Sequence, residues 1–257
     1  MLVLGLTGKV AIVTGGSEGL GRATAMRFAQ EGCHVVICAR RKDVLERAAE
    51  AIRKQTGVQV LAQTADVTRP ADVEAVVNAT LAAHGDVDIL VNNAGTSSAG
   101  PFEKVDDATW AADIEVKLMA AVRFGRLVIP QMKKRGGGRI VNVTTVGGKV
   151  PVARSLPTSV TRAAGINLTK SLANEYAPDH ILVNTVCLGL VKSAQWERRA
   201  KGGDMEAYYR EAAKRVPVGR VGEAEEFADL VAFLCSARAA YITGTAVNFD
   251  GGMSAAF

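Results

Sequence analysis

The sequence is poor in aromatic residues (5%) and has only seven prolines among its 257 residues. It contains no run of about 18 apolar residues, so we expect no membrane span. The start MLVLGLTGKV lacks the basic leader of a signal peptide. The 26 glycines follow no collagen period and no low-complexity pattern. These absences exclude the fibrous, disordered and membrane-spanning classes, and we expect a cytoplasmic protein.

Cysteine and histidine are also scarce, with four and three residues. No CxxC pair occurs, and no histidine stands at a metal-ligand spacing from a cysteine. We therefore expect buried free thiols, with no disulfide and no metal site, at Cys33, Cys38, Cys187 and Cys235.

The net charge is a modest +5, because 31 basic residues are interspersed with 26 acidic ones. Short basic runs at 133–135 and 198–201 are typical of solvated helix and loop faces. We expect no nucleic-acid partner, and the small positive balance suits a protein that binds small anions.

Apolar, β-branched runs alternate with longer amphipathic stretches along the chain. This alternation predicts a single-domain, Rossmann-type α/β fold with a doubly wound parallel sheet of about seven strands and helices on both faces. The expected strands are 10–14, 35–39, 58–64, 89–92, 139–144, 182–186 and 246–249. The expected helices are 24–31, 44–55, 72–84, 106–135, 158–176 and 223–235. We expect one domain over 1–257, from which 193–220 departs as a lid over the ligand.

A glycine-rich segment, TGGSEGLG at 14–21, joins the first expected strand to a helix. Backbone amides and a helix N-terminus are placed there to bind a pyrophosphate. The alternative is a glycine-rich turn without a ligand, but the strand before the loop and the helix after it favour dinucleotide binding.

Two arginines, Arg40 and Arg41, follow the second expected strand. NAD binders place an acidic residue there for the ribose hydroxyls, whereas arginine pairs with a 2′-phosphate. We therefore expect NADP(H) in preference to NAD(H), although Glu18 stands where many NADP binders carry a basic residue. The alternative interpretation of the arginines is a solvated helix start.

These motifs resemble the short-chain dehydrogenase/reductase family over nearly the whole chain. The TGxxxGxG loop stands at 14–21, the acidic residue beside the adenine is Asp66, and the NNAG segment stands at 92–95. The segments KSLANE at 170–175, PVGR at 217–220 and DGG at 250–252 look like the 3-oxoacyl carrier-protein reductase branch. The resemblance implies a small carbonyl or alcohol substrate and a homotetramer or dimer.

The resemblance also implies the cofactor contacts. Besides Arg40 and Arg41, they are Gly15, Ser17, Glu18, Gly19, Leu20, Gly21, Asp66, Val67, Asn93, Ala94, Gly95, Arg162, Gly189, Val191 and Ser193. Leu188-Gly189 replaces the family's Pro-Gly, and Ser193 replaces a threonine that contacts the carboxamide. Both changes are compatible with binding.

The four catalytic residues of that family, an Asn, a Ser and the Tyr and Lys of a YxxxK motif, are all replaced. No tyrosine of this chain has Lys or Arg four residues later. The unbroken flanking segments align Lys117 with the Asn, Thr145 with the Ser, Thr158 with the Tyr and Arg162 with the Lys.

The four substitutions differ in chemical severity. Thr145 keeps a hydroxyl donor, and Arg162 keeps a cation that can bind ribose hydroxyls. Thr158 replaces a phenol of pKa about 10 with a hydroxyl that ionises far above it, so it is no matched proton donor. At Lys117, burial and the Arg162 charge would lower the pKa and make it a replacement acid or a Schiff-base amine. The alternative is a lysine that extends to solvent or pairs with Glu115.

Three functions stay open. The first is an NADP(H)-dependent oxidoreductase that interconverts a carbonyl and an alcohol. The others are a lyase or isomerase that uses Lys117 without redox chemistry, and a silent NADP-binding partner subunit. Tyr208 or Tyr209 in the lid can serve as a surrogate acid, but packing of a lid helix is the preferred interpretation. The fold and the cofactor motifs favour the first function.

Overall fold

The structure is a computed structural model that describes residues 3–193 and 204–256. Seven parallel strands form one sheet in the order β3-β2-β1-β4-β5-β6-β7. They are β1 (Val10–Thr14), β2 (His34–Ala39), β3 (Val60–Thr64), β4 (Ile89–Asn92), β5 (Gly138–Thr145), β6 (Ile181–Leu188) and β7 (Ala246–Phe249). The order reverses between β1 and β4, and this confirms the predicted doubly wound fold.

The central strands are nearly continuous apolar runs. All five residues of β1 are buried, and β6 is buried except at Leu188. A parallel sheet that is covered on both faces needs no alternation of polar and apolar residues. This is why the apolar runs of the sequence locate the strands.

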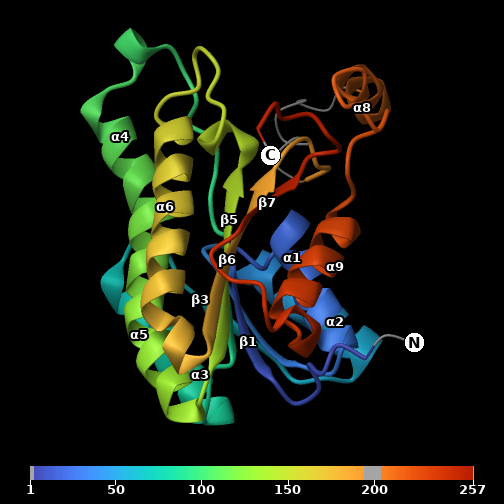
Figure 1. Ribbon diagram of the computed structural model, residues 1–257. Helices are drawn as coiled ribbons and strands as arrows, with labels where there is room; N and C mark the ends of the chain where they lie inside the picture. Colours follow the sequence, from blue (N-terminus) through green and yellow to red (C-terminus); the bar gives the residue numbers. More distant parts are fainter. Residues whose placement is uncertain (1–2, 194–203, 257) are drawn as a thin grey trace.

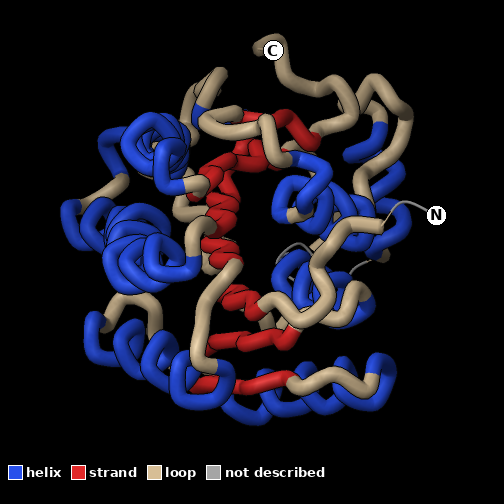
Figure 2. The backbone as a smooth tube through the Cα atoms, turned by 60° about the horizontal axis from the view of Figure 1, so that its bottom comes forward, coloured by secondary structure: helices blue, strands red, loops and turns tan. Residues whose placement is uncertain are grey.

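Helices cover both faces of the sheet (Figure 2). In Figure 1, α1, α2 and α9 lie on one face and α3, α5 and α6 on the other. Phe28 and Phe227 are fully buried on the first face, and Phe124 and Met132 on the second. The helices are α1 (Gly19–Gln30), α2 (Lys42–Thr56), α3 (Pro70–His84), α4 (Asp107–Ile114), α5 (Ala120–Arg135), α6 (Thr158–Tyr176), α8 (Met205–Ala213) and α9 (Ala224–Cys235).

The segment predicted as one helix over 106–135 is continuous but not uniform. A π turn, Glu115–Met119, joins α4 to α5. Asp106 caps the start of α4 by accepting a hydrogen bond from the Thr109 amide (2.8 Å). π turns of this kind often occur at functional sites, and this one contains Lys117.

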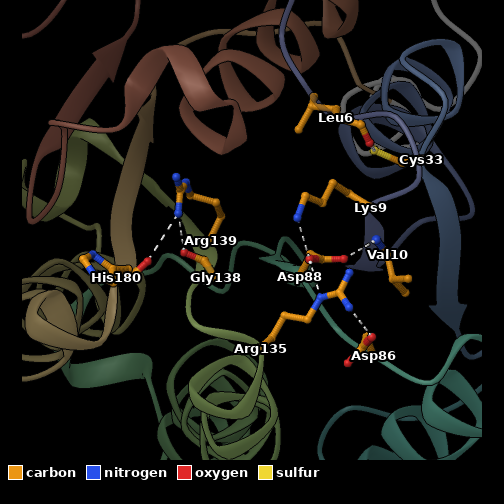
Figure 3. Close-up of polar contacts among 10 residues, drawn as sticks. All are labelled: Leu6, Lys9, Val10, Cys33, Asp86, Asp88, Arg135, Gly138, Arg139 and His180. Atoms are coloured by element: carbon orange, nitrogen blue, oxygen red, sulfur yellow. Dashed lines mark hydrogen bonds and ion pairs between the residues drawn. The ribbon is translucent and has the colours of Figure 1, made fainter.

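A buried carboxylate, Asp88, joins neighbouring elements at the amino-terminal ends of the strands (Figure 3). It accepts hydrogen bonds from Lys9 Nζ (3.0 Å) and from the Val10 amide (2.9 Å). Arg135 lies beside it and pairs with Asp86 through Nη1 (2.8 Å). These contacts tie β1, β4 and α5 together at the edge opposite to the predicted cofactor loop.

The expected lid over 193–220 contains α8, and residues 194–203 lie outside the described part of the chain. Figure 1 shows α8 above α9, across the sheet from α4 and α6. Among the described residues, no helix combines the length and the apolar character that a membrane crossing requires.

Candidate active site

The glycine loop leaves β1 at the point where the strand order reverses. Gly15 has a φ of +67°, a conformation that favours glycine. A side chain at Gly21 would collide with the Gly15 carbonyl and would lie 2.5 Å from Asn93 Nδ2. Both glycines are therefore required for the close approach of α1 to the end of β1.

The predicted NNAG segment is attached to this loop. Thr14 Oγ1 accepts hydrogen bonds from the amides of Asn93 and Ala94, both at 3.0 Å. Asn93 Nδ2 donates to the Thr14 carbonyl (2.8 Å). These bonds join the carboxyl ends of β1 and β4 at the point where the fold predicts a crevice for a dinucleotide.

Residues predicted for the adenine side lie at the ends of β2 and β3. Asp66 Oδ1 accepts hydrogen bonds from the amide and the hydroxyl of Thr68 (3.0 and 2.8 Å). Burial raises the pKa of Asp66, but these bonds and the charges of Arg40 and Arg69 outweigh it and lower the pKa overall. Asp66 is therefore ionised and fixed beside Arg40.

Arg41 is less available than predicted, because its Nη2 atom forms an ion pair with Glu18 of the glycine loop. The exposed fractions of the two side chains are 54% and 33%, so the pair lies at the surface of the crevice. Glu18 therefore competes with any phosphate for Arg41.

The remaining predicted cofactor residues line the same edge of the sheet. Gly189 follows β6 and donates its amide to the Phe249 carbonyl (3.0 Å). A Cβ on Gly189 would lie 2.6 Å from Asp250 Cβ. Ser17 lies in the glycine loop, and Gly19 and Leu20 lie in the first turn of α1. Val67, which is buried, follows Asp66, and Gly95 ends the NNAG segment. Val191, which is buried, and Ser193, which is half-buried, follow Gly189.

Lys117 lies inside the protein, with no exposed side-chain surface. Its Nζ atom forms an ion pair with Asp113, which is equally buried one turn earlier, and donates to Thr158 Oγ1 (2.9 Å). The alternative that Lys117 reaches solvent or Glu115 is wrong. Glu115 instead accepts a hydrogen bond from Arg123 Nη1 (2.6 Å).

Burial lowers the pKa of Lys117 to about 8. Asp113 opposes this shift by stabilising the ammonium, and the charge of Arg162 adds to it. The direction agrees with the expectation from sequence. The lysine therefore titrates near neutral pH, as an efficient general acid must.

Thr158 and Arg162, which the sequence aligns with the tyrosine and the lysine of the family, lie at the start of α6. Thr158 Oγ1 accepts a second hydrogen bond from the Ser98 amide (3.0 Å). Arg162 Nη1 donates to the Val143 carbonyl (2.6 Å). A Cβ on Gly95 would lie 2.9 Å from Arg162 Nη2. Arg162 is thus held between β5 and the NNAG segment, and burial lowers its pKa to about 10.

Thr145 is the last residue of β5, where it faces Leu188 of β6 in the sheet register. Among the described residues, its hydroxyl has no hydrogen bond to Lys117, Thr158 or Arg162. The structure therefore brings three of the four predicted catalytic residues together and places Thr145 outside their hydrogen bonds.

Asp113 and Thr161 are two members of this cluster that the sequence interpretation missed. Asp113 Oδ2 accepts a hydrogen bond from Thr161 Oγ1 (2.6 Å), so both carboxylate oxygens are used. A signal was available in the sequence. Asp113 and Lys117 stand four residues apart on the helix stripe that continues through Ala121 and Phe124, so both charges had to be buried and paired.

The other candidates in the sequence have structural positions. All four cysteines are buried free thiols, as predicted. Tyr208 and Tyr209 are on α8, where their rings contact edge to face at 5.7 Å. Within the described part of the chain, no group of three His, Cys, Asp or Glu side chains is arranged to hold a metal ion.

Comparisons with known proteins cover almost the entire chain. The profile of the family described as "Enoyl-(Acyl carrier protein) reductase" matches residues 15–254. "Dehydrogenase/reductase SDR family member 4" of Oryctolagus cuniculus is 36% identical over 252 residues, which cover 96% of this chain and 94% of the relative. The human protein of the same name is 34% identical over 252 residues, with 96% and 88% covered.

A solved structure also matches the whole chain. L-sorbose reductase from Gluconobacter frateurii, in complex with NADPH and L-sorbose, superposes with a TM-score of 0.96. It is 39% identical, and the match covers 100% of both chains.

Proposed function

The chain belongs to the short-chain dehydrogenase/reductase family and is an oxidoreductase of the carbonyl/alcohol class, and we propose that it uses NADP(H) and works without a catalytic tyrosine. The proposed catalytic residues are Lys117, Thr145, Thr158 and Arg162. One observation carries the proposal: Lys117 Nζ donates a hydrogen bond (2.9 Å) to the hydroxyl of Thr158, the residue that the sequence aligns with the family's tyrosine.

The crevice between β1 and β4 fits a dinucleotide cofactor. A side chain at Gly21 would fill the space in which the loop approaches Asn93, and the neighbouring backbone amides at the start of α1 can hold a pyrophosphate. When bound, the reduced nicotinamide supplies a hydride to the carbonyl carbon. The structural relative was solved with NADPH. In this chain Arg40 directly follows β2 and its charge acts on Asp66, which supports it as the ligand of a 2′-phosphate.

The chain's own residues have separable roles in this proposal. Asp66 and Val67 bind the adenine side, Asn93 to Gly95 support the ribose, and Gly189, Val191 and Ser193 hold the carboxamide side. Thr145 donates a hydrogen bond to the substrate carbonyl. Arg162 donates a hydrogen bond to the Val143 carbonyl and so holds the start of α6 against β5. The Lys117 ammonium is the proton source.

The Schiff-base alternative loses support from the position of Lys117. An amine that attacks a carbonyl must be neutral and accessible. The Lys117 side chain has no exposed surface and is ion-paired with Asp113. Borohydride reduction in the presence of a carbonyl substrate should therefore leave the mass of Lys117 peptides unchanged.

Calorimetric titration with NADPH and NADH tests the cofactor, and turnover by Lys117→Met tests the site. We expect micromolar NADPH affinity, weaker NADH affinity, and at least about a 100-fold loss of turnover in the variant. Lys134→Met, at an exposed position near the end of α5, is the matched control. Absence of binding by either cofactor, or unchanged turnover in Lys117→Met, would contradict the proposal.

A further inference from the structure

Lys117 cannot touch a substrate in the crevice. Its side chain has no exposed surface, and its ammonium donates to Asp113 and Thr158. Thr158 is partly exposed at the start of α6. The threonine hydroxyl therefore stands between the buried ammonium and the surface of the site.

The hydrogen bonds at Thr158 determine the direction in which its own proton points. A hydroxyl has two acceptor lone pairs and one hydrogen. Thr158 Oγ1 accepts from Lys117 Nζ (2.9 Å) and from the Ser98 amide (3.0 Å), so both lone pairs are used. Its hydrogen remains for a further acceptor, and a substrate carbonyl oxygen is an acceptor of this kind.

We propose that Thr158 relays a proton from Lys117 to the substrate oxygen, and that Asp113 is the positioning residue that aims Lys117 at Thr158. This inference rests on the proposed function. It goes further by assigning the contact with the substrate to Thr158 and by giving Asp113 a role.

The relay is balanced in atoms and charge. As the carbonyl carbon gains the hydride, the carbonyl oxygen takes the Thr158 hydroxyl proton, and the O–H bond of Thr158 breaks. Thr158 Oγ1 takes a proton from Lys117 Nζ, so the threonine is restored and Lys117 becomes a neutral amine. After the alcohol leaves, water returns a proton to Lys117 by the same route. Because Thr158 gains a proton from Lys117 as it gives up its own, it does not have to ionise to an alkoxide. The high pKa of an aliphatic hydroxyl is therefore no obstacle to the relay.

The charged groups around Lys117 define the role of Asp113. Among the described residues, Asp113 faces Lys117 from its own helix and Arg162 faces it from α6, while Glu115 in the π turn is bound by Arg123. Asp113 is also held by Thr161 (2.6 Å), so its carboxylate has one orientation. Loss of the Asp113 charge therefore disfavours the ammonium and lowers the pKa of Lys117.

The first test compares Thr158→Val with Thr158→Ser, using NADPH with L-sorbose and acetoacetyl-CoA as carbonyl probes. Valine keeps the shape of threonine but removes the relay, so we expect a loss of turnover of about 100-fold or more. Serine should restore turnover to within about 10-fold of the wild type, because the hydroxyl is the group that acts. Thr80→Val is the matched control, since Thr80 is fully buried in α3, where its hydroxyl donates to the Val76 carbonyl (2.7 Å).

The second test measures the Lys117 pKa directly by NMR of 13C-labelled lysine, in the free protein and without turnover. Asp113→Asn should move this titration to lower pH by about one unit or more, and Thr158→Val should move it less. The basic limb of the pH profile for carbonyl reduction should follow the same shift in Asp113→Asn. A purely structural role for Asp113 would lower the rate without moving either titration.

The outcomes separate the relay from the proposed function. Wild-type turnover that persists in Thr158→Val, or a Lys117 titration that Asp113→Asn leaves in place, overturns the relay while the oxidoreductase stands. No turnover of either probe by an NADPH-bound wild type overturns the proposed function and the relay together.

Discussion

Replacement of the buried ion pair by apolar residues, in the double variant Asp113→Leu/Lys117→Met, should stabilise the fold while it abolishes turnover. Burial lowers the pKa of Lys117 from 10.5 to about 8. Keeping this lysine charged at pH 7 therefore costs the folded state about 3 kcal/mol at 1.36 kcal/mol per pKa unit. Leucine and methionine carry no such cost, and Thr161 retains the Thr158 carbonyl (3.0 Å) as an acceptor. We expect the unfolding free energy to equal that of the wild type or exceed it by up to about 3 kcal/mol.

The pH dependence of the same measurement provides an internal check. Because the pKa of Lys117 is lower in the folded state, the unfolded chain binds more protons between pH 8 and 10.5. The contribution of Lys117 to wild-type stability therefore rises with pH in this window, and the advantage of the double variant should disappear by its upper end.

Urea unfolding of both proteins, followed by fluorescence between pH 7 and 10.5, gives these free energies. The single variant Asp113→Leu is the contrast, because it leaves a buried ammonium without its counter-charge and should lose about 3–5 kcal/mol. A double variant that is less stable than the wild type by more than about 2 kcal/mol at pH 7 would refute the reasoning. The ion pair between Asp113 and Lys117 would then stabilise the fold, and its presence would not require a catalytic explanation.

Three further predictions concern the cofactor crevice. Arg40→Ala should weaken NADPH binding by about 10-fold and leave NADH binding unchanged in calorimetry, because only the 2′-phosphate contact is lost; equal losses for both would contradict its role. Glu18→Gln should strengthen NADPH binding by about 3-fold or more, since Arg41 is released from its ion pair; an unchanged affinity would exclude Arg41 as a phosphate ligand. Gly95→Ala should reduce kcat by at least about 10-fold, because its Cβ would lie 2.9 Å from Arg162 Nη2 and displace that guanidinium; steady-state kinetics that match the wild type would show that Arg162 does not support the site.

The sheet and the form of the glycine loop were predictable because their signals are local. Buried parallel strands are continuous apolar runs, and the glycine loop needs glycine at positions where side chains would collide. Apart from the π turn within the helix expected over 106–135, the differences lie at the ends of elements. The strand expected from residue 58 begins at Val60, because Gly57 ends α2 in a left-handed conformation and the chain needs two residues to enter the sheet.

The cluster around Lys117, which we propose to be catalytic, was only half predictable. Alignment of the flanking segments brought Lys117, Thr158 and Arg162 together, but the partner that the sequence interpretation offered for the lysine was Glu115, whereas the structure shows Asp113. An aspartate on a helix is usually at the surface, so the position of Asp113 depends on tertiary packing of α4 against α6. The hydrogen bond from the Ser98 amide comes from a loop with no pattern in the sequence, and it is this bond that fixes the direction of the Thr158 hydroxyl.

In the proposed function, a lysine replaces the family's tyrosine as the proton source of an NADP(H)-dependent oxidoreductase. The most direct test of this role is the rate of NADPH oxidation with a carbonyl substrate across pH 6–10, in the wild type and in Lys117→Met. We expect the wild-type rate of carbonyl reduction to fall above pH about 8, as the ammonium is lost, and the variant to be slower by about 100-fold or more with no such fall. A variant that retains both the rate and the pH dependence of the wild type would contradict this role of Lys117.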